Sequence, residues 1–373
     1  MYKKSALRLF AGGAAAVCAA ATFLLLFMLH EQKQINETLS DAQHTLQMQN
    51  QELQQEINDL LTKKGGIEEH GQLSIKGTQL VDQNGNPLML RGVSSHGIAW
   101  YPEYTNYSAL KTLKDYGANV FRIAMYVEQN DGYLEEPELN KKLLFSAIEN
   151  SLAADLYTIV DWHVLRDENP SRNIEEAMDV LEEVAQRYGD NPGIIYEICN
   201  EPNGDTTYED IVHYAEQVIP IICKHAPNSI ILVGTPNFCT SLSEAIENPI
   251  EYQNIMYTYH YYAGISDCKY AMEEIARGLE GGLPIFVSEW GLDSHDVAEH
   301  HWNETRDFLD YLENKKIGWI NWSLSNKNEG YSMIEPASRK LNGWNEEDIT
   351  DSGRFVLKYL SLGKDQNLPL ITQ

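Results

Sequence analysis

Hydrophobic and polar positions divide the chain into a short N-terminal part and a longer C-terminal part. Residues 10–29 are twenty consecutive residues without a charge, and a helix of that length spans a hydrocarbon core of about 30 Å. Lys3, Lys4 and Arg8 precede this run, so we expect residues 1–9 to stay cytoplasmic and the rest to be exported. The pattern predicts a transmembrane anchor in the cell membrane with an extracellular C-terminal part. The alternative is secretion after signal-peptide cleavage, although no small-residue cleavage site follows the run.

Residues 30–66 are polar, rich in Gln and Asn, and contain a leucine at every seventh position. These leucines are Leu39, Leu46, Leu53 and Leu60. The spacing predicts a helical stalk with leucine at each d position of a heptad, but most of the matching a positions are polar. Residues 35–61 are therefore expected to form either a weak parallel coiled coil, which would make the protein a homodimer, or a monomeric helical spacer. Gly65-Gly66 is expected to act as a hinge after the stalk.

Residues 67–363 show an eightfold alternation of short β-branched or aromatic runs with helix-sized segments. The runs are residues 89–95, 120–125, 157–163, 194–201, 230–235, 254–262, 284–291 and 318–325. One helix is expected over residues 174–188, and a small hairpin over residues 71–82 precedes the first run. The pattern predicts an α/β fold, a (β/α)8 TIM barrel, followed by a C-terminal tail over residues 364–373. A doubly wound open sheet is the competitor, but no Gly-rich phosphate loop follows the first strand.

Charge and cysteine content narrow the classes of partner. The formal net charge is -27, so a nucleic acid would be repelled across most of the surface. The same charge disfavours anionic substrates and leaves a neutral polysaccharide as the better fit. Four cysteines of the C-terminal part can either pair after export or remain buried thiols: Cys199, Cys223, Cys239 and Cys268.

Polar and aromatic side chains gather at the carboxyl ends of seven of the eight predicted strands. They include His96, Arg122, Tyr126, His163, Asn200, Glu201, His260, Tyr262, Glu289 and Trp322. In a barrel these strand ends meet at one mouth, where active sites are built. Burying so many polar groups without a use would be costly. We therefore expect one site at this end of the barrel.

Glu201 and Glu289 end the fourth and seventh predicted strands. Two carboxyl groups across a cleft suit the cleavage of a glycosidic bond, because one attacks the anomeric carbon and the other protonates the leaving oxygen. A separation of about 5–5.5 Å implies retention of configuration, and about 6.5–9.5 Å implies inversion. Our hypothesis is that Arg122 keeps the nucleophile ionised while Tyr262 hydrogen-bonds to it.

This chemistry needs neither a metal ion nor a cofactor, and we expect none. The histidines His295, His300 and His301 lie close together, but their spacing matches no familiar metal-binding motif.

Aromatic residues near the strand ends indicate a sugar ligand, because the apolar faces of pyranose rings stack on such side chains. They are Trp100, Tyr126, Phe238, Tyr261, Trp290 and Trp322. For Trp290 and Tyr261, an equally good interpretation is that the rings only fill the top of the barrel.

Long strings at these positions resemble glycoside hydrolase family 5, and most closely its endoglucanases from bacilli and clostridia. The strings are residues 70–75, 91–97, 119–122, 195–204 and 285–291, and the likeness extends from about Glu69 to Leu360. The resemblance implies a retaining endo-β-1,4-glucanase, a cellulase, with Glu201 as acid/base and Glu289 as nucleophile. A mannanase, a xyloglucanase and an inactive glycan-binding protein are the alternatives on the same scaffold.

The resemblance also implies roles for the surrounding residues. Asn200 would hold the 2-hydroxyl of the sugar being cleaved, and further family residues around the carboxylates match Arg122, His163, His260 and Tyr262. Sugar-binding positions on the non-reducing side and farther out match His96, Trp322, Lys327 and Glu329. Phe238 is a departure, because related endoglucanases usually carry Trp as the stacking platform there.

Overall fold

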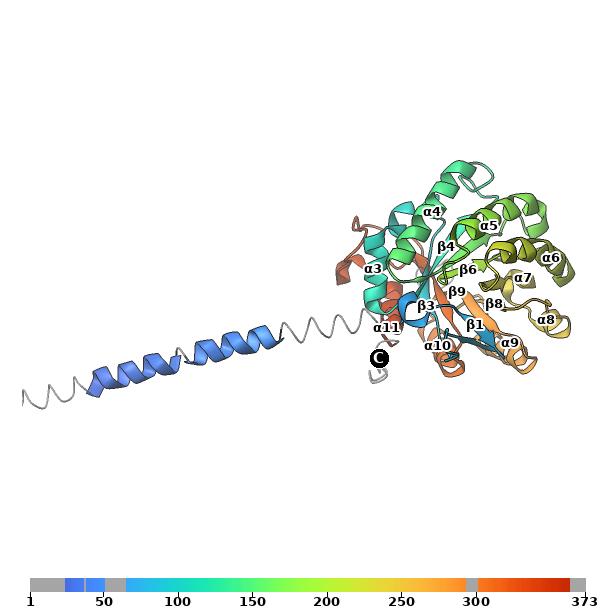
Figure 1. The fold of residues 1–373 in the computed structure, drawn as a ribbon. Coiled ribbons are helices and arrows are strands. Elements are labelled where there is room, and N and C mark those ends of the chain that lie inside the picture. Colours follow the sequence, from blue (N-terminus) through green and yellow to red (C-terminus); the bar gives the residue numbers. More distant parts are fainter. Residues whose placement is uncertain (1–23, 37, 51–64, 293–300, 363–373) are drawn as a thin grey trace, which may run out of the picture. The chain divides into compact units, whose positions relative to one another are not determined.

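The computed structural model describes residues 24–36, 38–50, 65–292 and 301–362 (Figure 1). The chain forms two compact units, residues 1–61 and 62–373. Residues 10–23 of the predicted anchor lie outside the described residues, as do residues 51–64 of the predicted stalk, His295, His300 and the tail. Among the described residues, we find no helix with the length and hydrophobicity of a membrane span.

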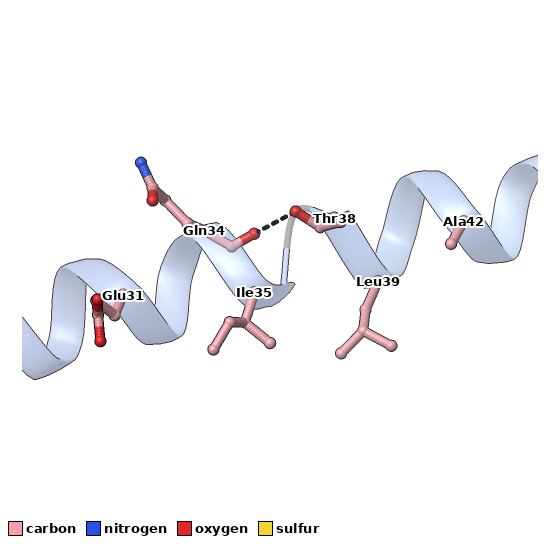
Figure 2. Close-up of a pocket in the computed structure, with 6 residues that line it drawn as sticks. All are labelled: Glu31, Gln34, Ile35, Thr38, Leu39 and Ala42. Atoms are coloured by element: carbon pink, nitrogen blue, oxygen red, sulfur yellow. Dashed lines mark hydrogen bonds between the residues drawn. The ribbon is translucent and has the colours of Figure 1, made fainter.

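The described residues of the first unit are helical over 24–36 and 38–50. Ile35 and Leu39 project from the same side of the helix and line a shallow surface groove (Figure 2). Thr38 Oγ1 donates a hydrogen bond to the Gln34 carbonyl oxygen at 2.9 Å, one turn back. Leu39 and Leu46, two of the predicted d positions, are 62% and 61% exposed in this chain. The helix predicted for the first part of the stalk is therefore present.

The second unit is built on eight parallel strands that close into a barrel, with the last strand paired to the first. The strands are β3 (Arg91–Ser95), β4 (Val120–Tyr126), β5 (Tyr157–His163), β6 (Ile194–Glu197), β7 (Ile230–Val233), β8 (Ile255–Tyr262), β9 (Ile285–Gly291) and β10 (Trp319–Leu324). Nearly all of their residues are buried, as expected for a parallel sheet covered on both faces. The predicted (β/α)8 barrel is confirmed.

Helices surround this barrel (Figure 1). They are α3 (Tyr107–Tyr116), α4 (Pro137–Ala153), α5 (Ile174–Tyr188), α6 (Tyr208–His225), α8 (Ser243–Glu247), α9 (Cys268–Glu280), α10 (Trp302–Lys315) and α11 (Asp351–Leu362), with the short α2 (Ile67–His70), α7 (Pro236–Cys239), η1 (Pro102–Thr105), η2 (Pro170–Asn173) and η3 (Glu346–Asp348). Helix α5 has the bounds that its apolar spacing predicts, and it buries Ala177, Val180, Leu181 and Val184.

A hairpin closes the amino-terminal end of the barrel. Strands β1 (Ser74–Lys76) and β2 (Gln79–Val81) pair antiparallel, as predicted, and Leu80 joins a buried cluster with barrel residues such as Leu90 and Ile230. The Tyr157 hydroxyl donates to the Gly71 carbonyl oxygen at 2.6 Å and ties the hairpin to β5. The hairpin does not cover the opposite end of the barrel, where the strands have their carboxyl ends and where a functional site is expected.

One predicted strand is shorter than expected. β6 ends at Glu197, so Glu201 lies in the loop after the strand and not at its end. The loop bonds back to the end of β5, because the Asn200 and Glu201 amides donate to the Trp162 and Val164 carbonyl oxygens at 3.2 and 3.1 Å. These irregular bonds end the regular ladder while they still hold Glu201 at the mouth of the barrel.

Candidate active site

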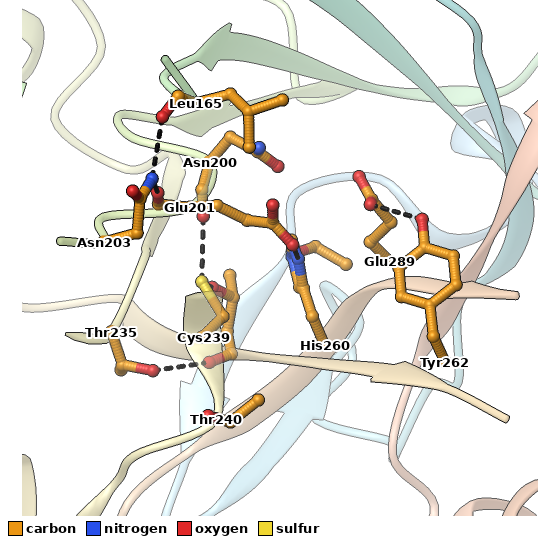
Figure 3. A network of polar contacts seen from close by, with 12 residues as sticks. Leu165, Asn200, Glu201, Asn203, Thr235, Cys239, Thr240, His260, Tyr262 and Glu289 are labelled. Atoms are coloured by element: carbon orange, nitrogen blue, oxygen red, sulfur yellow. Dashed lines mark hydrogen bonds and ion pairs between the residues drawn. The ribbon is translucent and has the colours of Figure 1, made fainter. Parts of the chain in front are cut away.

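Glu201 and Glu289 face one another at the carboxyl end of the barrel (Figure 3). One carboxylate oxygen of each, together with a ring nitrogen of His260, lies within 4.8 Å of the other two atoms. This separation belongs with the short spacing of about 5–5.5 Å rather than the long spacing of about 6.5–9.5 Å. The two carboxyl groups are close enough for one to attack, and the other to protonate, a single glycosidic bond.

Glu289 is bound by two donors. Arg122 Nη1 donates to Glu289 Oε2 at 3.0 Å, and the Tyr262 hydroxyl donates to Glu289 Oε1 at 2.6 Å. Burial raises the pKa of Glu289, and His260 and Arg122 oppose that rise. Burial and the nearby carboxylates hold the pKa of Tyr262 well above its ordinary value, so its hydroxyl remains a donor. Both contacts stabilise the ionised form of Glu289.

Glu201 lies in a different environment, where no lysine or arginine of the described residues forms an ion pair with it. Burial raises its pKa to about 8, and the charges of Asp161 and Glu197 add to the rise while Arg122 opposes it. His260 Nδ1 lies 2.8 Å from Glu201 Oε1, and His260 Nε2 lies 2.9 Å from Ser288 Oγ. Burial lowers the pKa of His260 to about 4, so the ring is neutral near pH 7. A protonated Glu201 that donates to Nδ1 satisfies this geometry.

Asn200 is fixed on both sides of its amide. Arg122 Nη2 donates to Asn200 Oδ1 at 2.6 Å, and Asn200 Nδ2 donates to the Val164 carbonyl oxygen at 3.1 Å. Asn200 Nδ2 also lies 3.3 Å from His163 Nε2, while His163 Nδ1 lies 2.6 Å from Asp161 Oδ2. Burial lowers the pKa of His163 well below its ordinary value. His163 is therefore a neutral ring with the proton on Nδ1, facing Asp161.

An aromatic wall lies beside this polar centre. Tyr126 packs on His163 with ring centroids 4.0 Å apart, and Trp322 stacks on His163 at 5.3 Å. Trp100 packs on Tyr126 at 4.6 Å, and His96 lies 5.1 Å from Trp322. The wall presents rings of the kind that stack on pyranose faces.

A small polar cluster borders the aromatic wall. Lys327 Nζ lies 3.3 Å from His96 Nε2 and 2.6 Å from Glu329 Oε2. Burial lowers the pKa of His96 to about 3, so His96 is neutral. The structure thus brings together six of the predicted sugar-binding residues: His96, Trp100, Tyr126, Trp322, Lys327 and Glu329.

Phe238 belongs to a separate region beside the Glu201 loop. Its amide donates to the Pro202 carbonyl oxygen at 3.0 Å, and its side chain is 45% exposed. Asn237, Phe238 and Cys239 all have left-handed backbone angles, with φ of 57°, 56° and 56°. The Cys239 thiol donates to the Asn200 carbonyl oxygen at 2.8 Å (Figure 3), which fastens this turn to the loop carrying Glu201. Phe238 therefore offers an exposed ring on a turn that is bonded to the loop carrying Glu201.

Residues 81–328 match the family described as cellulase (glycosyl hydrolase family 5). The chain belongs to glycoside hydrolase family 5. It is 40% identical over 291 residues to an endoglucanase from Clostridium saccharobutylicum, which covers 77% of this chain and 64% of that protein. It is 39% identical over 319 residues to endoglucanase A from Butyrivibrio fibrisolvens, covering 84% and 72% of the two chains. The chain therefore spans slightly less than two thirds of the first of these relatives.

Solved structures agree with this membership. The catalytic domain of an endoglucanase from Thermobifida fusca, in complex with cellotetraose, matches with a TM-score of 0.75 at 32% identity, over 79% of this chain and 98% of that one. A structure from Cytophaga hutchinsonii matches with a TM-score of 0.76 at 37% identity, over 79% and 96%. The resemblance predicted from the sequence strings is confirmed, and the chain is a glycoside hydrolase.

Two aromatic rings of this family 5 enzyme do not lie in the site, contrary to one of our interpretations. Trp290 and Tyr261 are fully buried. Trp290 packs edge-on against Trp319 at 5.7 Å, and Tyr261 stacks on Phe308 of α10 at 4.1 Å. Successive strand residues point to opposite faces. Because Glu289 and Tyr262 face the site, their neighbours Trp290 and Tyr261 face away from it.

Sequence reasoning gave no role to three polar residues of the site. Glu197 and Asp161 bind Arg122 from the barrel interior, at 2.6 Å to Nε and 3.0 Å to Nη2. Ser288 bonds to His260. Asp161 and His163 stand two positions apart on one strand, so the period-two rule already puts them on one face. Glu197 carries no such signal, because its neighbours on β6 are apolar.

The sequence predicts no metal site and leaves open whether the four cysteines of the C-terminal part pair. Within the described ranges, Glu201, His260 and Glu289 form one group with metal-ligand spacing. The Arg122 guanidinium already supplies the positive charge that Glu289 needs. Glu201, His260 and Glu289 are therefore best described as an acid–base pair with a neighbouring histidine. Cys199, Cys223, Cys239 and Cys268 are all free thiols in the structure.

Proposed function

We propose that this chain is a retaining endo-β-1,4-glucanase that hydrolyses internal β-1,4-glucosidic bonds of cellulose or a related β-glucan. One observation carries the proposal: two carboxyl groups within 4.8 Å of each other have opposite environments, one bound to a guanidinium and one without a cationic partner. A pair held in this way is suited to double displacement, because one member is ionised while the other keeps its proton.

In the first step, ionised Glu289 attacks the anomeric carbon and forms a glycosyl ester. The bond between that carbon and the leaving oxygen breaks, and Glu201 transfers its proton to this oxygen. In the second step Glu201, now a carboxylate, takes a proton from water. The resulting hydroxide attacks the anomeric carbon, the ester bond breaks, and Glu289 returns as a carboxylate. Two inversions at one carbon give net retention.

The surrounding residues position the reacting groups. Arg122 and Tyr262 orient Glu289, and neutral His260 orients Glu201. We assign Asn200 to the 2-hydroxyl of the sugar being cleaved, the aromatic wall and the Lys327–Glu329 pair to the sugars on its non-reducing side, and Phe238 to the leaving-group side. The endoglucanase relatives, and the cellotetraose bound to the Thermobifida fusca catalytic domain, support a β-glucan as substrate.

A panel of polysaccharides tests the proposal. The purified protein should release new reducing ends from carboxymethyl cellulose and lower its viscosity early, and NMR should show the β-anomer as the first product. Activity on mannan or xyloglucan alone would replace the glucanase assignment. Binding of cello-oligosaccharides with no product would indicate a glycan-binding protein, and a first-formed α-anomer would reject the retaining mechanism.

We also propose that residues 10–29 anchor the enzyme in the cell membrane with the catalytic unit outside. The proposal rests on the uncharged run and the basic residues before it. In cell fractionation, the full-length chain should stay with the membranes, and protease added to intact cells should remove the catalytic unit. A shortened chain in the medium would instead show that the segment is a cleaved signal peptide.

The heptad leucines lead us to propose a homodimer through residues 35–61. Sedimentation of residues 31–373 should then give twice the monomer mass at micromolar concentration. A monomer under these conditions would identify the segment as a helical spacer.

A further inference from the structure

Three buried carboxyl groups share one guanidinium in the barrel interior. Arg122 on β4 reaches Glu197 Oε2 through Nε at 2.6 Å, Asp161 Oδ2 through Nη2 at 3.0 Å and Glu289 Oε2 through Nη1 at 3.0 Å. Arg122, Asp161 and Glu197 are fully buried, and Glu289 is almost so. Only one positive charge faces three acids, so the arrangement holds more carboxyl groups than are needed to neutralise Arg122.

The second pair of acids is built into the barrel itself. Asp161 and Glu197 are direct partners in the parallel ladder of β5 and β6. Among the residues that the structure describes, Asp161 Oδ1 and Glu197 Oε1 have no hydrogen-bond partner, although both are buried. A buried, incompletely satisfied acid is costly in free energy and adds nothing to packing that Gln or Leu would not supply. A role in the reaction accounts for this cost.

We propose that Glu197 is a positioning residue for the reaction: it is ionised, it holds Arg122 between Glu289 and Asn200, and its negative charge keeps Glu201 protonated. Glu197 binds the Nε edge of the guanidinium, which leaves Nη1 free to reach Glu289 and Nη2 free to reach Asn200. Asp161 supports the same arrangement. Asp161 also pairs with Nη2 of Arg122, and it binds the His163 ring that borders Asn200. This inference rests on the proposed function.

Burial and the charge of Asp161 raise the pKa of Glu197, while the charge of Arg122 and its hydrogen bond from Nε oppose that rise and favour the ionised form. The charges of Asp161 and Glu197 raise the pKa of Glu201 beyond the effect of burial, and Arg122 alone would lower it. Burial raises the pKa of Asp161 to about 7 against the opposing charge of Arg122, so Asp161 loses its proton as the pH rises through about 7. The ionisable groups that contribute to the site come from five barrel strands and α7: Arg122, Tyr126, Asp161, His163, Glu197, His260, Tyr262, Glu289 and Cys239.

The decisive variant is Glu197→Gln in the full chain. Gln keeps the length of the side chain and an oxygen that accepts from Arg122 Nε, but it removes the charge. Without that charge the pKa of Glu201 falls, so the alkaline limb of kcat/KM against pH should move to lower pH by roughly half a unit or more, the size expected for one nearby unit charge in an effective dielectric of about 20 to 40. KM on a soluble β-glucan should change less than about twofold.

Glu197→Asp separates position from charge. It keeps the charge but is one methylene shorter, so it should lower kcat roughly tenfold and leave the alkaline limb in place. The matched control is Glu274→Gln, which removes an equally buried glutamate on α9 that accepts from the Leu242 amide at 3.0 Å. This control should leave both the limb and kcat unchanged. A folded Glu197→Gln enzyme with an unmoved alkaline limb would overturn the inference.

The order in which Glu197 and Glu201 ionise can also be measured on the wild-type protein without a substrate. In a 13C NMR titration of side-chain carboxyl groups, Glu197 should be ionised at pH 6 while Glu201 is still protonated. A protonated Glu197 at pH 6 would also overturn the inference. If the wild-type enzyme released nothing from any β-glucan, the proposed function would fail, but the order of ionisation of Glu197 and Glu201 would still be measured.

Discussion

Arg122 Nη1 lies 3.0 Å from Glu289 Oε2, while Glu201, whose carboxylate is within 4.8 Å of Glu289, contacts no lysine or arginine in the part of the chain that the structure describes. This asymmetry separates two chemically identical side chains. Glu289 is held by a guanidinium and a phenol, and Glu201 by a neutral imidazole. The same residue type can therefore act as nucleophile at one position and as acid at the other.

The two glutamates should respond differently to the leaving group. Glu289→Gln removes the nucleophile, so turnover should fall about 10⁴-fold or more on both polysaccharide and dinitrophenyl β-cellobioside. Glu201→Gln should lose about 10²- to 10⁴-fold on polysaccharide, which needs a proton at the leaving oxygen. Dinitrophenolate needs none, so this variant should give a burst of dinitrophenolate followed by slow turnover in stopped-flow absorbance.

The control for both substitutions is Glu274→Gln, which should retain wild-type turnover on both substrates. A burst from Glu289→Gln, with none from Glu201→Gln, would show that the two roles are reversed.

The pH dependence follows from the environments of the same pair. The pKa of Glu201 is raised to about 8, so its proton is lost, and kcat/KM falls, as the pH rises through about 8. Burial also raises the pKa of Glu289 above its ordinary value of 4.5, so the acid limb should lie above that value. Initial rates on a soluble glucan in constant-ionic-strength buffers give both limbs. Constant activity from pH 7 to pH 10 would contradict the assignment of Glu201 as the acid.

The dependence of Tm on pH should show the raised pKa of the buried Glu201 without any measurement of activity. Because the pKa of Glu201 rises from 4.5 to about 8 on folding, the folded state binds more protons across this window and loses stability as the pH increases. Gln does not titrate. Glu201→Gln should therefore match the wild type in Tm near pH 4 and exceed it increasingly up to about pH 8. Calorimetry at several pH values measures the difference, and a gain in Tm that is independent of pH would point to packing alone.

Two tryptophans on adjacent strands provide a matched pair. Trp322 belongs to the aromatic wall, so Trp322→Ala should raise KM for cello-oligosaccharides about tenfold or more, with a smaller effect on stability. Trp290 is fully buried against Trp319, so Trp290→Ala should cost about 3–5 kcal/mol of stability and leave KM unchanged in the protein that folds. Urea unfolding and steady-state kinetics on both variants test the contrast. Equal effects on KM would place Trp290 in the site.

The local pattern predicted much of this molecule correctly. The eight runs of β-branched and aromatic residues predicted eight barrel strands, and the spacing of Ala177 and Val180 predicted the bounds of α5. Strand-end chemistry also predicted that Glu201 and Glu289 would meet, because all parallel strands of a barrel point their carboxyl ends at one mouth. The strands and helix α5 can be predicted because each depends on the spacing of apolar residues within one short segment of the sequence.

Two details do not follow from the strand sequences. The sequence predicts Glu201 at the end of a strand, but β6 ends at Glu197. For Trp290 and Tyr261 it leaves two interpretations open, and both rings prove to be buried. A strand has two faces, and its sequence alone does not say which face is the site when both are buried. The ladder between β8 and β9, with its irregular register near His260 and Glu289, decides this.

The amino-acid sequence by itself determined the barrel, the family and the side chains able to carry acid–base chemistry, because each is encoded within a strand or at its end. Only the tertiary structure decided that Glu197, Asp161 and Glu289 share Arg122, and that Glu201 pairs with none of the described lysines and arginines. Those contacts join strands far apart in sequence, and they depend on how the barrel closes and how its strands are staggered. The distances that separate a nucleophile from an acid are therefore properties of the closed barrel and not of any segment of it.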